Sequence, residues 1–225
     1  MTATTKDAEA AIHLNSLPTE PRSKPAPSSP IAGLHFSYAK SPSDVDSNLL
    51  ILLHGLGDNE KNFFDLGKHL QRTLPQTAVL SLRVPWRVPL LEAESFMWWE
   101  TFTPLMEKLP NQDPTPFTKS FSELICHLVS PVAESSSDVP GCGWLASSIH
   151  LLGFGQGGTA ALEGTINWTL DRRKQSRAGA PNLQSIGSVV TISGPLISYP
   201  TFTPSIATPV LLYHRFPTAA PNTNS

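Results

Sequence analysis

The sequence contains few cysteines, few charged residues and no long unbroken apolar run. Its two cysteines, Cys126 and Cys142, match neither a zinc-site spacing nor a disulfide framework, so we expect reduced thiols, no metal and no cofactor. Only 15% of residues are charged and the net charge is -2, which excludes a general attraction to nucleic acid. No apolar run is long enough to span a bilayer, and the start lacks a signal-peptide pattern. These absences favour a soluble cytoplasmic protein, with the nucleus as an alternative; the oligomeric state stays open.

What is present is enough for one globular domain with irregular ends. The chain has 225 residues, of which 40% are hydrophobic. Residues 1–33 are rich in proline and serine, and such a segment buries too little apolar surface to offset the entropy of ordering it. We therefore predict a disordered arm over residues 1–33, a domain over residues 34–214 and an irregular tail over residues 215–225.

Apolar runs and helical patterns alternate along the domain. We predict strands over residues 34–39, 49–53, 77–82, 149–152, 186–192 and 209–213, and helices over residues 59–73, 117–129 and 156–170. The run at 49–53 is continuously aliphatic, which is typical of a strand covered on both faces of a parallel sheet. The pattern predicts a doubly wound α/β fold whose mostly parallel sheet is flanked by helices, with sites at the carboxyl ends of the strands.

One stretch organises this pattern, the glycine-rich turn Gly153-Phe154-Gly155-Gln156-Gly157. It stands between an apolar strand and a helix, like the G-x-S-x-G elbow that presents a nucleophilic serine at the top of a sheet. Gly153 and Gly157 occupy the two glycine positions of that elbow, but Gly155 occupies the position of the serine. Glycine adopts positive φ freely, so the substitution preserves the bend and removes the hydroxyl.

The same glycines allow a second interpretation. Gly153, Gly155 and Gly158 have the spacing of a dinucleotide-binding G-x-G-x-x-G loop, and Asp171 lies loosely near the expected acidic position. Such a loop opens its domain, whereas this turn lies deep within the chain. We therefore rank a nucleotide-binding module lowest.

Taken together, the motifs resemble the phospholipase/carboxylesterase family, which includes the acyl-protein thioesterases. The resemblance is carried, in the family's order, by residues 52–58, 82–89, 152–158, 192–194 and 208–214. It implies an α/β-hydrolase fold and, in active members, hydrolysis of acyl esters or thioesters by a Ser-Asp-His triad. It also implies an oxyanion hole made by the backbone N–H groups of Leu56 and Gln156. Nothing in it makes His54 catalytic.

The departures from the family concern the triad itself. Gly155 stands where the family has serine, and no Asp or Glu follows His214. The later strand, histidine loop and final helix of the family do not fit in the residues that remain. The resemblance therefore predicts a C-terminally truncated domain with no intact triad.

Three hypotheses follow. The first is a catalytically inactive family member that keeps a surface for an acyl ester, an acyl thioester or a lipidated protein. The second is an active carboxylic ester hydrolase of a diverged branch, represented by an incomplete chain, and the third is the nucleotide-binding module. For an acyl ligand, Trp98 and Trp99 in the aromatic segment 96–102 are candidates for an apolar pocket wall, although ordinary packing is the slightly favoured interpretation.

Overall fold

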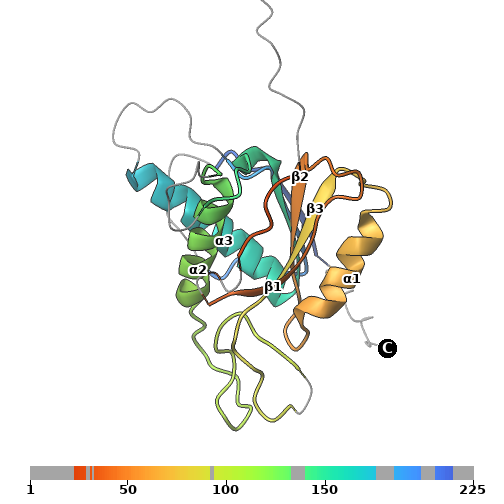
Figure 1. Ribbon diagram of the computed structural model, residues 1–225. Helices are drawn as coiled ribbons and strands as arrows, with labels where there is room; N and C mark the ends of the chain where they lie inside the picture. Colours follow the sequence, from red (N-terminus) through yellow and green to blue (C-terminus); the bar gives the residue numbers. More distant parts are fainter. Residues whose placement is uncertain are drawn as a thin grey trace, which may run out of the picture.

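A six-stranded sheet lies at the centre of the described part of the chain in a computed structural model (Figure 1). The structure describes residues 23–28, 31, 33–91, 94–132, 140–175, 185–198 and 206–214. The strands are β1 (His35–Ala39), β2 (Asn48–Leu53), β3 (Thr77–Arg83), β4 (Ile149–Phe154), β5 (Ser188–Ile192) and β6 (Val210–Tyr213). Their order is β1-β3-β2-β4-β5-β6, and only β1 runs antiparallel to its neighbour. The predicted mostly parallel α/β sheet is confirmed.

Three α-helices flank the sheet in two layers: α1 (Glu60–Leu70), α2 (Thr115–Val129) and α3 (Gln156–Gln175). Helix α1 contacts β1, β2 and β3 on one face. Helix α3 contacts β2, β4 and β5 on the other face, and α2 packs against α3 (Figure 1). Strand β2 therefore lies between helical layers, and its Leu49, Ile51 and Leu53 are fully buried, as its continuous aliphatic sequence predicts.

The helix ends differ modestly from the sequence-based expectations. Helix α1 begins after Asn59, whose side chain accepts the backbone N–H groups of Lys61 and Asn62, and it ends three residues before the expected 73. Helix α2 begins two residues earlier than expected, with a proline in its first turn. Helix α3 continues five residues past the expected end at 170.

The segment between β3 and α2 leaves the sheet as an irregular excursion, drawn at the bottom of Figure 1. It returns to the sheet through Phe96 and Trp98. The Phe96 backbone pairs with Asp58, and Trp98 Nε1 donates to the His54 carbonyl oxygen at 2.8 Å. The excursion is thus anchored beside the carboxyl end of β2.

A part of the segment assigned to the arm, residues 23–28, lies against the domain. The backbone N–H of Lys24 donates to buried Asp46 at 2.6 Å, and Lys24 Nζ donates to the Gly143 carbonyl oxygen at 2.8 Å. Residues 1–22 and 215–225 lie outside the described residues. None of the described helices combines the length and apolar character needed to cross a membrane.

Candidate functional site

The turn between β4 and α3 has the geometry of an elbow. Gly155 has φ +52°, and α3 begins at the next residue. The Gly155 N–H donates to the Ile192 carbonyl oxygen at 2.8 Å, and the Gly155 carbonyl oxygen accepts Thr159 N–H at 3.1 Å. The predicted strand-turn-helix is therefore formed at the carboxyl edge of the sheet.

The glycines of this turn play different steric roles. A Cβ on Gly153 would lie 2.3 Å from the Gly157 carbonyl oxygen, and a Cβ on Gly157 would lie 2.3 Å from the carbonyl oxygens of Leu53 and His54. A Cβ on Gly155 would meet no atom within 4 Å. The flanking glycines are required by close packing, whereas a side chain at 155 would project into open space.

The turn after β2 lies directly beside the elbow. Leu53 pairs with Gly153 in the parallel register, and a Cβ on Gly157 would lie 2.3 Å from the His54 carbonyl oxygen, so this turn begins in contact with the elbow. Gly57 N–H donates to the Phe96 carbonyl oxygen at 2.9 Å, which fixes this turn to the excursion. Among the described residues the backbone N–H of Leu56 has no hydrogen-bond partner. Gln156 is the first residue of α3, where backbone N–H groups have no partner within the helix.

Leu56 and Gln156, the two residues predicted to form an oxyanion hole, thus belong to two neighbouring turns. The hole itself stays a prediction, because no ligand defines the position of an oxyanion. Leu56 and Phe154 are 41% and 49% exposed, so the surface beside the elbow is apolar and open.

The side chain of Gln156 has a role that sequence reasoning missed. Its Oε1 accepts the backbone N–H of Trp98 at 2.9 Å, and its Nε2 donates to Thr101 Oγ1 at 2.7 Å. These bonds tie the elbow to the aromatic segment of the excursion. They join residues 58 and 55 positions apart, so no local sequence signal announces them.

The two candidate wall residues lie in different surroundings. The Trp98 ring is fully buried, with its centroid 4.8 Å from that of His54 and 5.0 Å from that of Phe117. Trp99 is 2% exposed, and its Nε1 donates to Gln112 Oε1 at 2.8 Å. Trp99 also lines a pocket of about 270 Å³ together with Trp86.

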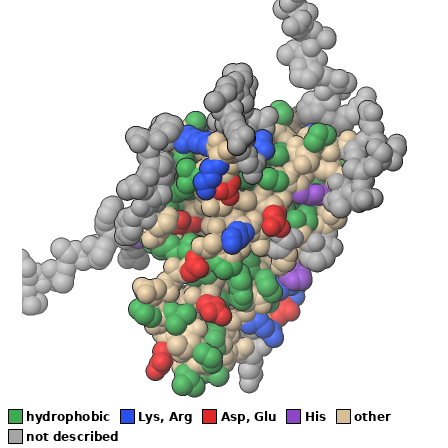
Figure 2. Space-filling model, turned by 90° about the vertical axis from the view of Figure 1, so that its left-hand side faces the viewer, with side chains coloured by type: hydrophobic (Ala, Val, Ile, Leu, Met, Phe, Trp, Pro, Cys, Tyr) green, Lys and Arg blue, Asp and Glu red, His purple; other side chains and the backbone are tan. Residues whose placement is uncertain are grey.

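A neighbouring pocket of about 370 Å³ shares part of that lining. The residues common to the two pockets are Trp86, Glu100 and Leu109. The space-filling view shows apolar side chains gathered at the lower end of the face that carries α2 and α3 (Figure 2). The two pockets are lined mainly by residues of the excursion, to which the Gln156 side chain is hydrogen-bonded.

His54 is buried under the elbow, and this burial disfavours its protonated form. Burial lowers its pKa, outweighing the contact with the Gly55 carbonyl oxygen, to which Nδ1 donates at 2.8 Å. Its Nε2 is buried and has no hydrogen-bond partner in the described part of the chain. Across described residues 23–198, no histidine forms a hydrogen bond or ion pair with a carboxylate. His214 is exposed at the end of β6.

A second turn at the same edge also escaped the sequence-based reasoning. Ser193 follows β5 and has φ +58°, a left-handed conformation that serine rarely adopts. Its backbone N–H donates to the Tyr213 carbonyl oxygen at 2.7 Å. Because Gly155 N–H bonds to Ile192, the residue before Ser193, the two turns are direct neighbours. Residues 192–194 matched a family motif, but their sequence did not indicate a left-handed backbone at Ser193.

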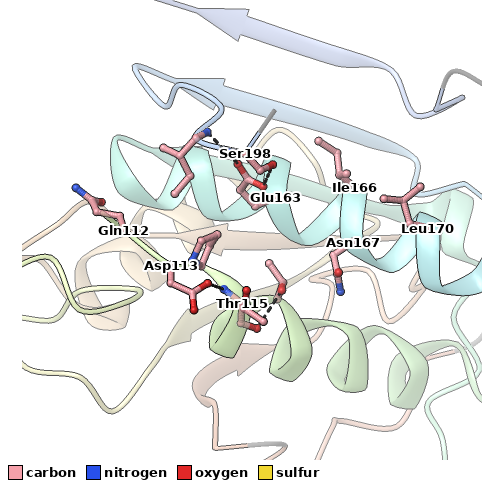
Figure 3. A pocket seen from close by; sticks show the side chains of 11 residues that line it. Gln112, Asp113, Thr115, Glu163, Ile166, Asn167, Leu170 and Ser198 are labelled. Atoms are coloured by element: carbon pink, nitrogen blue, oxygen red, sulfur yellow. Dashed lines mark hydrogen bonds between the residues drawn. The ribbon is translucent and has the colours of Figure 1, made fainter. Parts of the chain in front are cut away.

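A further pocket of about 350 Å³ lies between α2 and α3, with Glu163, Asn167 and Thr118 in its lining (Figure 3). Glu163 is 4% exposed and its carboxylate accepts hydrogen bonds from Ile197 and Ser198. Among the described residues no three acidic, histidine or cysteine side chains gather into a group that could hold a metal ion.

Comparisons with known proteins agree with this architecture. The family model described as Phospholipase/Carboxylesterase matches residues 36–215. An uncharacterised hydrolase of Mycosarcoma maydis is 46% identical over 184 residues, which are 82% of this chain and 62% of that protein. An uncharacterised hydrolase of Schizosaccharomyces pombe is 38% identical over 124 residues, covering 53% of this chain and 46% of its own length. The chain therefore spans less than two thirds of either relative.

The fold likeness extends to solved structures. A carboxylesterase from Mesorhizobium loti superposes with a TM-score of 0.52 at 14% identity, covering 85% of this chain and 75% of that one. At this identity the likeness concerns the fold.

Proposed function

The chain belongs to the phospholipase/carboxylesterase family, and from this premise we propose that it binds acyl esters or thioesters at the elbow without hydrolysing them at an enzymatic rate. The observation that carries the proposal is Gly155. It has the positive φ of an elbow and open space around it, but no hydroxyl. The surface of the elbow therefore remains available for binding, but residue 155 offers no nucleophile that could form a covalent acyl intermediate.

The surroundings of the elbow support binding. The backbone N–H groups of Leu56 and Gln156 would donate to the acyl carbonyl oxygen, and main-chain donors do not depend on side-chain identity. The pocket beside Trp99, with its aromatic lining, would take the start of an apolar acyl chain. We place the carbonyl above Gly155 and the acyl chain toward the excursion.

The arithmetic of catalysis separates binding from turnover. An oxyanion hole with substrate binding, but without a triad, retains about 10³–10⁴-fold over the water reaction. Enzymes typically reach at least about 10⁶-fold. We therefore expect wild-type protein to accelerate ester hydrolysis by no more than about 10³–10⁴-fold over the reaction in water.

The test combines binding with turnover. Wild-type protein is titrated with p-nitrophenyl octanoate while tryptophan fluorescence and p-nitrophenol release are followed. We expect saturable fluorescence change with release at no more than the triad-free level. Gly155→Ser should leave release at that level, because no histidine among the described residues of 23–198 is paired with a carboxylate. The matched control is Gly33→Ser, at a distant positive-φ glycine that also has open space.

Two results would contradict the proposal. If folded wild-type protein does not bind p-nitrophenyl octanoate saturably, the proposal that it binds acyl ligands is wrong. Rapid release by wild-type protein would show that hydrolysis proceeds without a residue-155 nucleophile.

A further inference from the structure

Ser193 is a second functional group at the elbow, held in a strained conformation by buried contacts. A non-glycine residue at φ +58° costs free energy, and such outliers persist only where surrounding structure determines them. They concentrate at binding and catalytic sites. The contacts around Ser193 therefore show whether the surrounding structure holds it in this strained conformation.

Helix α3 supplies most of those contacts. Thr159 Oγ1 donates to the Pro195 carbonyl oxygen at 2.7 Å. A Cβ on Gly194 would lie 2.5 Å from Thr159 N, so residue 194 is pressed against the first turn of α3. Glu163 accepts the backbone N–H groups of Ile197 and Ser198 at 2.9 and 2.8 Å, and its bonds to Ser198 are drawn in Figure 3.

The turn is also held from the sheet side. Ser193 N–H bonds to Tyr213, and Thr191 Oγ1 donates to the Gly194 carbonyl oxygen at 3.2 Å. In contrast, no described residue exchanges a hydrogen bond with Ser193 Oγ, and the side chain is half-buried. The backbone N–H of Ser193 is hydrogen-bonded, whereas its hydroxyl has no hydrogen-bond partner among the described residues.

Sheet order places Ser193 on one defined side of the elbow. Strand β4 lies between β2 and β5, so the turn containing Leu56 is on one side of Gly155 and Ser193 is on the other. The excursion with its apolar pockets is bonded to the β2 side through Phe96 and Trp98. An acyl chain that runs toward those pockets leaves the alcohol half of the ester facing Ser193.

We propose that Ser193 contacts the alcohol half of the ligand, and that the site prefers acyl esters of hydroxyl-bearing alcohols over esters of plain alkyl alcohols. This inference rests on the proposed acyl-binding function. The hydroxyl of Ser193 both donates and accepts, so it pairs with a ligand hydroxyl, and a ligand that lacks one leaves it unpaired.

The probes are 1-octanoylglycerol and propyl octanoate, which share the acyl chain and differ by two hydroxyls. Calorimetric titration of wild-type protein should give about 5–10-fold tighter binding of 1-octanoylglycerol, the size expected for one net hydrogen bond. Ser193→Gly should bring the ratio of the two affinities to about one, chiefly by weakening the binding of 1-octanoylglycerol. Ser193→Asn tolerates the left-handed backbone and keeps a polar group, so it should retain part of the preference.

Thermal stability provides an independent measurement, because we expect Ser193→Gly to raise stability while it lowers affinity. Ser193→Gly relieves the strained backbone and should raise Tm by about 2 °C while binding weakens. The matched control is Asp44→Gly, because Asp44 has φ +56° in an exposed turn between β1 and β2. It should change neither affinity.

Each outcome is decisive. If wild-type protein binds both probes and Ser193→Gly keeps the preference, the role of Ser193 is wrong and acyl binding stands. Equal weakening for both probes would mean a purely structural role and would also overturn it. If folded wild-type protein binds neither probe, the proposed function itself fails.

Discussion

Two neighbouring turns at the carboxyl edge of the sheet have the same left-handed backbone, but one has a glycine where the other has a serine. Gly155 follows β4 with φ +52°, and Ser193 follows β5 with φ +58°. Glycine stands where a side chain would have open space, and serine stands where glycine would remove strain. The left-handed backbone accounts for the glycine at 155 but not for the serine at 193, and the position of the hydroxyl is the difference that matters to a ligand.

The two turns are supported in different ways. Below Gly155, backbone packs directly on backbone, with Gly157 against the carbonyl oxygens of Leu53 and His54. Around Ser193, side chains of α3 reach across to the loop, with Thr159 and Glu163 as the main contributors. The first support tolerates no added atom, whereas the second can be altered one hydrogen bond at a time.

The largest effect is expected below the elbow. Gly157→Ala puts a Cβ 2.3 Å from two carbonyl oxygens, and relief requires β2 and α3 to move apart. We expect the free energy of unfolding to fall by about 3 kcal/mol in urea denaturation. Gly155→Ala is the control and should cost only about 1 kcal/mol, because it adds backbone strain without a clash. Equal losses of stability in the two variants would show that Gly155 and Gly157 do not differ in how tightly their surroundings are packed.

A smaller effect is expected from acid, and it acts through His54 under the same turn. Burial lowers the pKa of His54, so below the ordinary histidine value of about 6.5 the unfolded chain takes up a proton that the folded chain refuses. Stability should therefore be lost as the pH falls from 6.5 toward 5.5, by at most about 1.4 kcal/mol for this group.

His54→Asn isolates that contribution, since burial also lowers the pKa of His127 and His150. The variant should be less stable at pH 7 but show a shallower dependence of unfolding free energy on pH. His69→Asn, at an exposed position of α1, is the matched control. An unchanged slope in His54→Asn would mean that His54 is protonated equally in both states.

The sequence was sufficient wherever a structural requirement is local. The aliphatic run of β2 and the glycines Gly153 and Gly157 predicted a buried strand and an elbow, because strand burial and tight turns depend on adjacent residues. The glycine pattern pointed to Leu56 and Gln156 only with the help of the family resemblance, since the strand order that makes their turns neighbours is not written in any one segment.

The sequence was insufficient where distant segments meet. The side-chain bonds of Gln156 reach the excursion, and the strain at Ser193 is imposed by α3. Helix α3 itself was predicted too short because residues 171–175 are all polar and continue no apolar pattern that would mark them as helical. A Cβ on Gly164 would lie 2.7 Å from the Phe121 ring. Such a helix lacks the single apolar stripe by which a helix is usually found.

The smallest change in stability is expected from exchanging the two residues. Gly155→Ser adds a strained residue at the elbow, for about 1 kcal/mol, and Ser193→Gly removes one, for about 0.5–1 kcal/mol. The double variant should therefore unfold within about 0.5 kcal/mol of wild-type protein, while its preference for 1-octanoylglycerol is lost. Urea denaturation and calorimetric titration of the two single variants and the double variant check both statements. If the double variant is no more stable than Gly155→Ser alone, Ser193 stores no strain, and the contrast between the two turns is one of side chains only.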